Sequence, residues 1–165
     1  MDAPATKRRK GREWALQMIV QADLNPFASA DLILSHFWEQ QWSCRQEAAG
    51  KEDGDLDDLE RTLKPGERLA STGLREFTET LVRGVLGHLA QIDDALQPLC
   101  EHWSLDRIGV IERCVLRLGV YEIGTLKTPA PVAINEAVEV AKRFSNAEAG
   151  AFVNGILDQY AKRRR

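Results

Sequence analysis

The chain has 165 residues, of which 44% are hydrophobic and 28% charged, so it can bury the core of one domain without metals or disulfides. Its formal net charge of −3 excludes a uniformly basic protein, so a site for a polyanion must be local. The apolar runs are too short to cross a bilayer or to form a secretory signal, and we expect a cytoplasmic protein with a single domain over residues 1–165.

The N-terminal arm, residues 1–12, is basic: residues 1–13 hold five basic side chains and two acidic ones. A first helix is predicted from about residue 9 to residue 22, because apolar residues recur there at helical spacing and form a core face of Ala15, Met18, Ile19 and Ala22. Asn25 before Pro26 ends this helix, since a residue before proline is pushed out of the helical region.

A second helix is predicted over residues 30–46, with four side chains available for burial: Leu32, Ile33, Phe37 and Trp38. An acidic connector follows at about residues 47–68, where eight acidic residues outnumber four basic ones. A short helical turn within the connector is predicted at residues 56–63.

Beyond the connector, apolar residues three or four positions apart predict a long helix. It begins at residue 73 or 74, ends between residues 89 and 92, and its pattern continues through a bend to residue 99. Gly84 and Gly87 each cost this helix about 1 kcal/mol of propensity relative to alanine. Their small size predicts a close helix crossing.

Three more helices are predicted in the C-terminal part. Residues 105–125 are apolar around most of a helical circumference, which predicts a helix at the centre of the core. Pro131 suits the first turn of the next helix, on which Glu139 and Arg143 have the i, i+4 spacing of an ion pair. The last helix is predicted to bury Val153, Ile156, Leu157 and Tyr160. No useful length of sequence alternates with period two, so we predict an all-α fold.

The sequence offers little chemistry for catalysis or metal binding. It has no glycine-rich phosphate loop and no H-E-x-x-H or G-x-S-x-G motif, and its three histidines are isolated. Cys44, Cys100 and Cys114 are odd in number and widely spaced, without a C-x-x-C pair, which favours reduced thiols over disulfides or zinc. We therefore expect no enzyme activity, no metal and no cofactor.

The basic run KRRKGR is the first candidate binding site. It supplies Lys7, Arg8, Arg9, Lys10 and Arg12, and clustered cations bind phosphates and release condensed counterions from nucleic acid. Short basic runs also occur as solvated tails. The four cations at residues 162–165 are a weaker candidate, because cations also favour a helix C-terminus through its dipole.

Three further candidates lie at the edges of predicted apolar faces. Glu112 is placed beside an apolar face, so it forms either an ion pair within the chain or a contact with a partner protein or RNA. Phe152 is offset from the apolar stripe of the last helix and lies near Glu148. An exposed Phe152 can stack on an unpaired base, whereas a wider core face would bury it.

Four segments together resemble the NusB family of bacterial transcription antitermination factors. They are R-x-x-x-R-E-x-A-L-Q at residues 8–17, then ERCVLRLGVYE, VAINEAVEVAKRFS and FVNGILD. The resemblance covers residues 8–23 and about 77–160, which is more than half of the chain. VAINEAVEVAK followed nine residues later by FVNGILD is its most specific part.

This resemblance implies an all-α fold of about seven helices in two three-helix subdomains. It also implies a factor without enzyme activity that binds boxA-type RNA through its arginine-rich N-terminus, with Arg8, Arg9 and Arg12 as contacts. Such a factor acts with the ribosomal protein NusE and joins RNA polymerase complexes that resist termination, including on ribosomal RNA operons. A homodimer stays open beside a monomer.

The resemblance assigns roles to other positions as well. Glu148 and Phe152 fall near the RNA surface, and Glu112 falls at the interface with NusE and RNA. Val20 occupies a partner-binding position where many relatives carry tyrosine or phenylalanine, so an aromatic contribution is missing there. Gly11 interrupts the arginine-rich run where alanine is usual, which predicts a basic segment that stays frayed until RNA orders it.

Two alternatives stay open. A NusB-like domain also forms the N-terminal RNA-binding part of some ribosomal RNA cytosine methyltransferases, and a chain that ends at Arg165 would be a fragment of such an enzyme. The other alternative is a helical adaptor that binds only proteins. RNA binding by this chain would exclude the adaptor.

Overall fold

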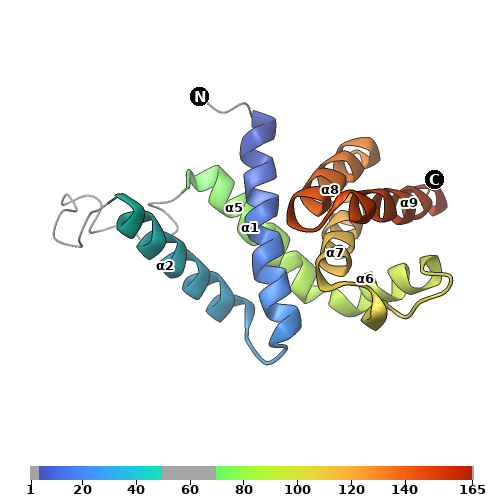
Figure 1. Cartoon of the computed structure of the whole chain (residues 1–165), viewed down its shortest axis with the longest axis horizontal. Coiled ribbons are helices and arrows are strands. Elements are labelled where there is room, and N and C mark those ends of the chain that lie inside the picture. The colour runs from blue at the N-terminus through green and yellow to red at the C-terminus, as the bar shows by residue number, and fades with distance from the viewer. Residues whose placement is uncertain (1–3, 50–69, 165) are drawn as a thin grey trace.

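The computed structural model describes residues 4–49 and 70–164 (Figure 1). Within these ranges it contains seven α-helices and no strand, so the predicted all-α fold is confirmed. The helices are α1 Pro4–Leu24, α2 Ala30–Ala49, α5 Thr72–Gly87, α6 Leu89–Leu96, α7 Val110–Gly124, α8 Ala130–Phe144 and α9 Ala147–Arg163. Two short 3-10 helices, Gln97–Leu99 and Leu105–Arg107, lie between α6 and α7.

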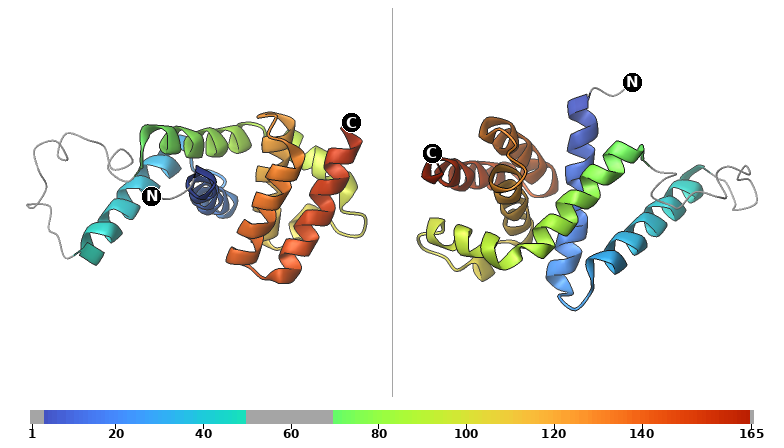
Figure 2. Two further views of the ribbon diagram at one scale, coloured as in Figure 1. Left: turned by 90° about the horizontal axis from the view of Figure 1, so that it is seen from above. Right: turned by 180° about the vertical axis from the view of Figure 1, so that it is seen from behind.

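The helices form two groups that meet at α1. In Figures 1 and 2, α1 lies between α2 on one side and the group of α7, α8 and α9 on the other. Helix α5 packs along α1 and also contacts α2 and α7, while α8 and α9 pack closely against each other and against α7. This arrangement agrees with two three-helix subdomains, α1–α2–α5 and α7–α8–α9, with α6 between them in the chain.

One hydrophobic cluster connects all seven helices. The predicted core face of α1 is buried, and so are the four residues predicted for α9. In α7 every residue from Cys114 to Glu122 is buried, as its apolar circumference predicts. In α2, by contrast, the prediction is wrong for Leu32, which is 60% exposed, and Leu34 is buried in its place.

Helix α7 begins at Val110, later than the predicted residue 105. Ile108 has an extended backbone with ψ of 140°, which separates the 3-10 turn at Leu105–Arg107 from α7. The side chain of Arg113 donates to the carbonyl oxygens of Leu105 and Ile108 at 3.0 and 2.8 Å. This side chain therefore satisfies carbonyl groups that a continuous helix would have paired.

Two glycines show where helices approach each other closely. A side chain at Gly84 would overlap the ring of Tyr121, so the predicted close crossing is confirmed between α5 and α7. The same prediction is wrong for Gly87, because a Cβ atom at Gly87 would meet nothing within 4 Å. At Gly119 in α7, a Cβ atom would lie 2.5 Å from Cδ1 of Leu157. The packing of α9 against α7 therefore also requires a small residue at position 119.

The basic segment is helical, which corrects the expectation of a frayed arm. Helix α1 begins at Pro4, and Gly11 is buried inside it. A Cβ atom at Gly11 would lie 3.0 Å from Cδ1 of Phe77 and 3.0 Å from Oγ1 of Thr78. Glycine therefore lets the basic half of α1 pack directly on α5.

Two other expectations concern the connector and membranes. The turn predicted at residues 56–63 lies outside the described residues, as does the acidic connector beyond residue 49. Among the helices that the structure describes, none has the length and apolar character needed to cross a membrane.

Candidate nucleic-acid interface

The five cations of the KRRKGR run fall into classes with different surroundings. Lys7 and Arg8 are exposed, and neither forms an ion pair with another described residue. Lys10 is also exposed, Arg9 is half-buried and Arg12 is buried. The basic half of α1 therefore presents Lys7 and Arg8 to solvent, whereas Arg9 pairs with α8 and Arg12 with α7.

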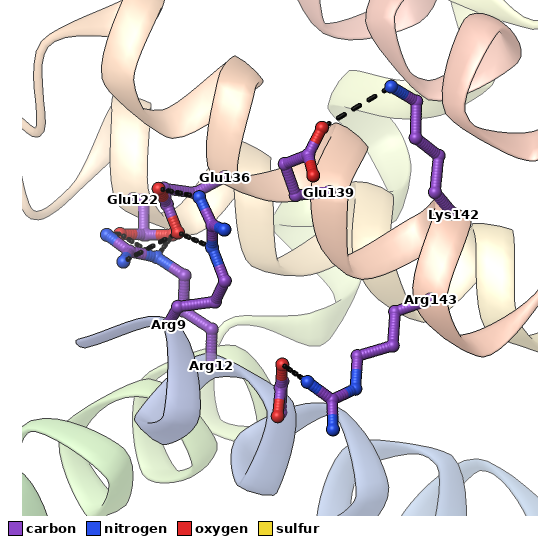
Figure 3. Close-up of polar contacts among 8 residues, drawn as sticks. Arg9, Arg12, Glu122, Glu136, Glu139, Lys142 and Arg143 are labelled. Carbon is purple, nitrogen blue, oxygen red and sulfur yellow. Dashed lines mark hydrogen bonds and ion pairs between the residues drawn. The ribbon is translucent and has the colours of Figure 1, made fainter. Parts of the chain in front are cut away.

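Arg9 forms a two-bond ion pair with Glu136 of α8. Its Nε and Nη2 atoms donate to the two carboxylate oxygens at 3.0 and 2.9 Å (Figure 3). These hydrogen bonds hold the pKa of Glu136 below its usual value, and the same pair raises the pKa of Arg9. Arg9 keeps 37% of its side chain exposed, so it is fixed in place and still accessible.

Arg12 is an internal residue, which corrects its assignment as an RNA contact. Its Nε and Nη2 atoms donate to Glu122 of α7 at 2.7–3.2 Å, and its Nη1 atom lies 3.7 Å from Glu136. Only 6% of the Arg12 side chain and 3% of the Glu122 side chain are exposed. Because both ions are withdrawn from solvent, the guanidinium of Arg12 neutralises Glu122 and is not available to a phosphate.

A further carboxylate of this region, Glu13 on α1, lies close to two cations. Nη1 of Arg143 is 3.0 Å from Glu13, and Nζ of Lys10 is 3.8 Å from it. The predicted pair between Glu139 and Arg143 is therefore wrong. Arg143 reaches from α8 toward α1, and Glu139 instead pairs with Lys142 at 3.3 Å (Figure 3).

These side chains line an open hollow between α1, α8 and the start of α5. Among the residues that the structure describes, four cations and one carboxylate line this hollow. The lining residues described are Lys7, Arg9, Lys10, Glu13, Ser71, Leu74 and Arg143. A concave surface lined by several cations suits a chain of phosphate groups, because the fields of its charges add within the hollow. Arg143 was missed from the sequence, although its place in the last turn of α8 is a usual one for a cation.

The aromatic ring of Phe77 in α5 lies against two arginines of the basic run, Arg8 and Arg12. The guanidinium carbon atoms of Arg8 and Arg12 lie 5.4 and 5.2 Å from its ring centre. A cation over an aromatic face is attracted by the ring quadrupole, which restricts the orientation of Arg8 without cancelling its charge. The sequence gives no local signal for this contact, since Phe77 is far from the basic run.

Glu148 and Phe152 lie in the first half of α9. The side chain of Asn146 caps this helix by accepting from the backbone N–H of Ala149 at 2.8 Å. Glu148 is exposed, and Phe152 is 37% exposed. Of the two positions that the sequence leaves open for Phe152, the structure therefore has the exposed one and not the buried one.

Glu112 lies in the first turn of α7, and Val20 lies near the end of α1. Glu112 accepts a hydrogen bond of 2.7 Å from Oγ of Ser145, at the turn between α8 and α9. Val20 is partly buried against the core, one turn before Asp23, whose carboxylate lies 2.6 Å from Nη2 of Arg113. Glu112 is thus hydrogen-bonded within the chain, without a described cation as partner, and it is not enclosed.

A model of the NusB family matches residues 9–162. A relative from Anaeromyxobacter sp. (strain Fw109-5), named transcription antitermination protein NusB, is 37% identical over 94% of this chain and 90% of its own length. Among solved structures, T. maritima NusB matches with a TM-score of 0.72 and 31% identity, over 98% of this chain and 93% of that chain.

A further structural match concerns the fold alone. It is to the crystal structure of antitermination factors NusB and NusE in complex with dsRNA, with a TM-score of 0.70 at 24% identity. The match covers 96% of this chain and 98% of that chain.

Proposed function

The chain belongs to the NusB family, and from this premise we propose that it is an RNA-binding transcription antitermination factor without enzyme activity. Two of the relatives that it resembles are named transcription antitermination protein NusB and match over nine-tenths or more of their own length. This likeness favours the antitermination function over that of an RNA methyltransferase.

The cationic hollow between α1 and α8 is the observation that carries this proposal. It places Lys7, Lys10, Arg9 and Arg143 around one concave surface, with Arg8 exposed on the same helical segment. Cations in such a cluster supply affinity for phosphates that does not depend on base sequence. Phe152 adds an exposed ring that can stack on an unpaired base.

The partners proposed are boxA-type RNA, the ribosomal protein NusE and, through them, an RNA polymerase antitermination complex that acts on ribosomal RNA operons. We place the RNA on the cationic hollow and near Glu148 and Phe152, and we place NusE near Glu112 and Val20. A homodimer is an alternative state of the free protein.

Titration of labelled boxA-type RNA, with and without NusE, tests this function. The protein should bind boxA-type RNA more tightly than a scrambled RNA of equal length, and NusE should increase the affinity. Lys7→Ala combined with Arg8→Ala should weaken binding and reduce the slope of log affinity against log salt by about 1.4, since each lost contact with single-stranded RNA contributes about 0.7.

Arg45→Ala combined with Arg83→Ala is the matched control. These arginines are exposed on α2 and α5, and Arg83 pairs with Asp31 of α2. In Figure 1, α2 lies on the side of α1 away from α8. The control removes the same charge and should leave the salt slope unchanged. Absence of RNA binding at every salt concentration would overturn the proposal in favour of a protein-binding adaptor.

A further inference from the structure

Two carboxylates lie directly behind the exposed cations of the hollow. The side chains of Glu136 and Glu13 are only 9% and 4% exposed. Their partners Arg9, Lys10 and Arg143 are 37%, 48% and 65% exposed. The cations therefore form the outer layer of the surface, and the carboxylates form an inner layer between α1 and α8.

The pairing of Arg9 leaves one edge of its guanidinium group free. Glu136 takes the hydrogen atoms of Nε and one of Nη2, on the side edge of the group. Nη1 donates to no described residue. Since a guanidinium group has five N–H donors in a planar fork, its end edge can still bind a phosphate through two hydrogen bonds.

The carboxylate behind Arg9 has two physical effects on RNA binding. Its negative charge opposes the approach of a phosphate to Arg9, so it lowers the attraction of this position for every polyanion. It also fixes the plane of the guanidinium group, so less side-chain entropy is lost when a phosphate arrives at the matching place. The first effect weakens binding to all RNA, and the second favours RNA whose backbone follows the right path.

Lys7 and Arg8 lack such a carboxylate, which gives an internal contrast. Neither forms an ion pair with a described residue, and Arg8 lies over an uncharged ring. The segment from residue 7 to residue 10 thus carries cations with and without an acidic partner. The unpaired cations supply general attraction, and the paired ones respond to geometry.

We propose that Glu136 is a positioning residue that raises the selectivity of the RNA-binding surface by holding Arg9 and reducing its attraction for non-cognate phosphates. This proposal rests on the RNA-binding function proposed above. Arg12 adds a second positive charge beside this carboxylate, because its Nη1 lies 3.7 Å from Glu136. The carboxylate thus lies between two guanidinium groups, and it stays paired with Arg9 while the end edge of Arg9 binds a phosphate.

Glu136→Gln is the decisive variant. Glutamine has nearly the same shape and still offers one acceptor to Arg9, but it carries no charge. The salt slope for scrambled RNA should steepen by about 0.7, the value of one additional phosphate contact. Affinity for scrambled RNA should rise about threefold. This is the size of the repulsion in water between one unit negative charge and a phosphate on the other side of the guanidinium group, and the variant removes that charge. Affinity for boxA-type RNA should rise less, because Arg9 is held less firmly.

Three companion variants separate this mechanism from simpler ones. Asp158→Asn is the matched control, since it also removes one negative charge, from an exposed pair with Lys162 on α9. In an Arg9→Ala background, Glu136→Gln should have little effect on the salt slope. Glu13→Gln removes the second inner carboxylate and should also favour scrambled RNA. Thermal unfolding of each variant sets the folded fraction used to calculate affinity.

A steeper slope and a lower ratio of boxA to scrambled affinity, both dependent on Arg9, would support the proposal. Equal losses of affinity for both RNAs, or an unchanged slope, would overturn it and make Glu136 a structural residue. If the wild-type protein discriminates between the RNAs and Glu136→Gln changes nothing, only this inference fails. If the wild-type protein binds neither RNA, the proposed function fails and takes the inference with it.

Discussion

Arg12→Ala is expected to destabilise the fold more than it weakens RNA binding, because Arg12 is an internal counter-ion. Its guanidinium group contacts both carboxylate oxygens of Glu122 at 2.7–3.2 Å, and both side chains are almost completely withdrawn from solvent. Truncation leaves Glu122 buried between α1 and α7 without its hydrogen-bonded cation. It also removes an aliphatic stem from a packed helix junction.

The expected cost follows from this burial. Loss of one partner from a buried ion pair lowers the free energy of unfolding by about 3–5 kcal/mol. In a domain of this size each kcal/mol lowers the melting temperature by about 2–4 °C, so Arg12→Ala should melt about 6–20 °C below the wild-type protein. Arg8→Ala, on an exposed side chain over Phe77, should cost at most about 1 kcal/mol.

Urea unfolding followed by far-UV circular dichroism measures the free energy of unfolding. RNA titration corrected for the folded fraction measures the RNA affinity. We expect Arg12→Ala to shift the unfolding midpoint strongly and Arg8→Ala to lower RNA affinity with a small shift. A stability loss below about 1 kcal/mol for Arg12→Ala, with affinity lowered as much as in Arg8→Ala, would show that Arg12 contacts RNA directly.

Three other changes have measurable outcomes. Phe152→Ala should reduce RNA affinity by about 1–3 kcal/mol with little change in unfolding; a large stability loss with normal affinity would place the ring in the core. Glu112→Lys should reduce the NusE-containing complex recovered by gel filtration while helical content and the thermal midpoint stay near wild type, whereas an unfolded variant would make Glu112 structural. Burial raises the pKa of Asp23, but hydrogen bonds from Arg113 and Arg117 lower it overall. The stability that Asp23 adds is therefore present above the ordinary value of 3.8 and lost as pH falls through the lower folded pKa, so Asp23→Asn should flatten the acid-unfolding curve in that range.

Helical periodicity predicted those parts of the fold that depend on local sequence. The buried face of α1 and the nearly all-apolar α7 follow from residues three or four positions apart. The same spacing predicted one helix to residues 89–92, whereas α5 ends at Gly87 and α6 begins at Leu89. Leu32 and Gly87 show the limit of this reasoning. An apolar residue or a glycine on a helix can face solvent, and only the packing partner decides between burial and exposure.

The sequence predicted which residue types form the candidate site, but it did not predict which side chains form ion pairs with each other. The basic run identified the correct half of α1, yet Arg12 is buried because Glu122, 110 residues away, lies opposite it. Arg143 has the spacing to pair with Glu139 on its own helix, but it reaches Glu13 on α1. These pairs depend on how α1 docks against α7 and α8, and local spacing contains no information about that docking.

Charged pairs at the junction of the two helix groups give the proposed RNA-binding surface its geometry. Arg117 of α7 lies 2.6 Å from Asp23 of α1 and 2.8 Å from Asp93 of α6, and Arg9 and Arg12 connect the other end of α1 to α8 and α7. Apolar contacts are not directional, so a helix can shift along an apolar surface at small cost, whereas two-bond arginine pairs require one relative position of the helices. Since the cationic hollow takes side chains from both groups, a shift of α1 along α8 would separate Arg9 from Arg143. We infer that these ion pairs contribute more to the alignment of the binding surface than to stability, because desolvation offsets much of their attraction.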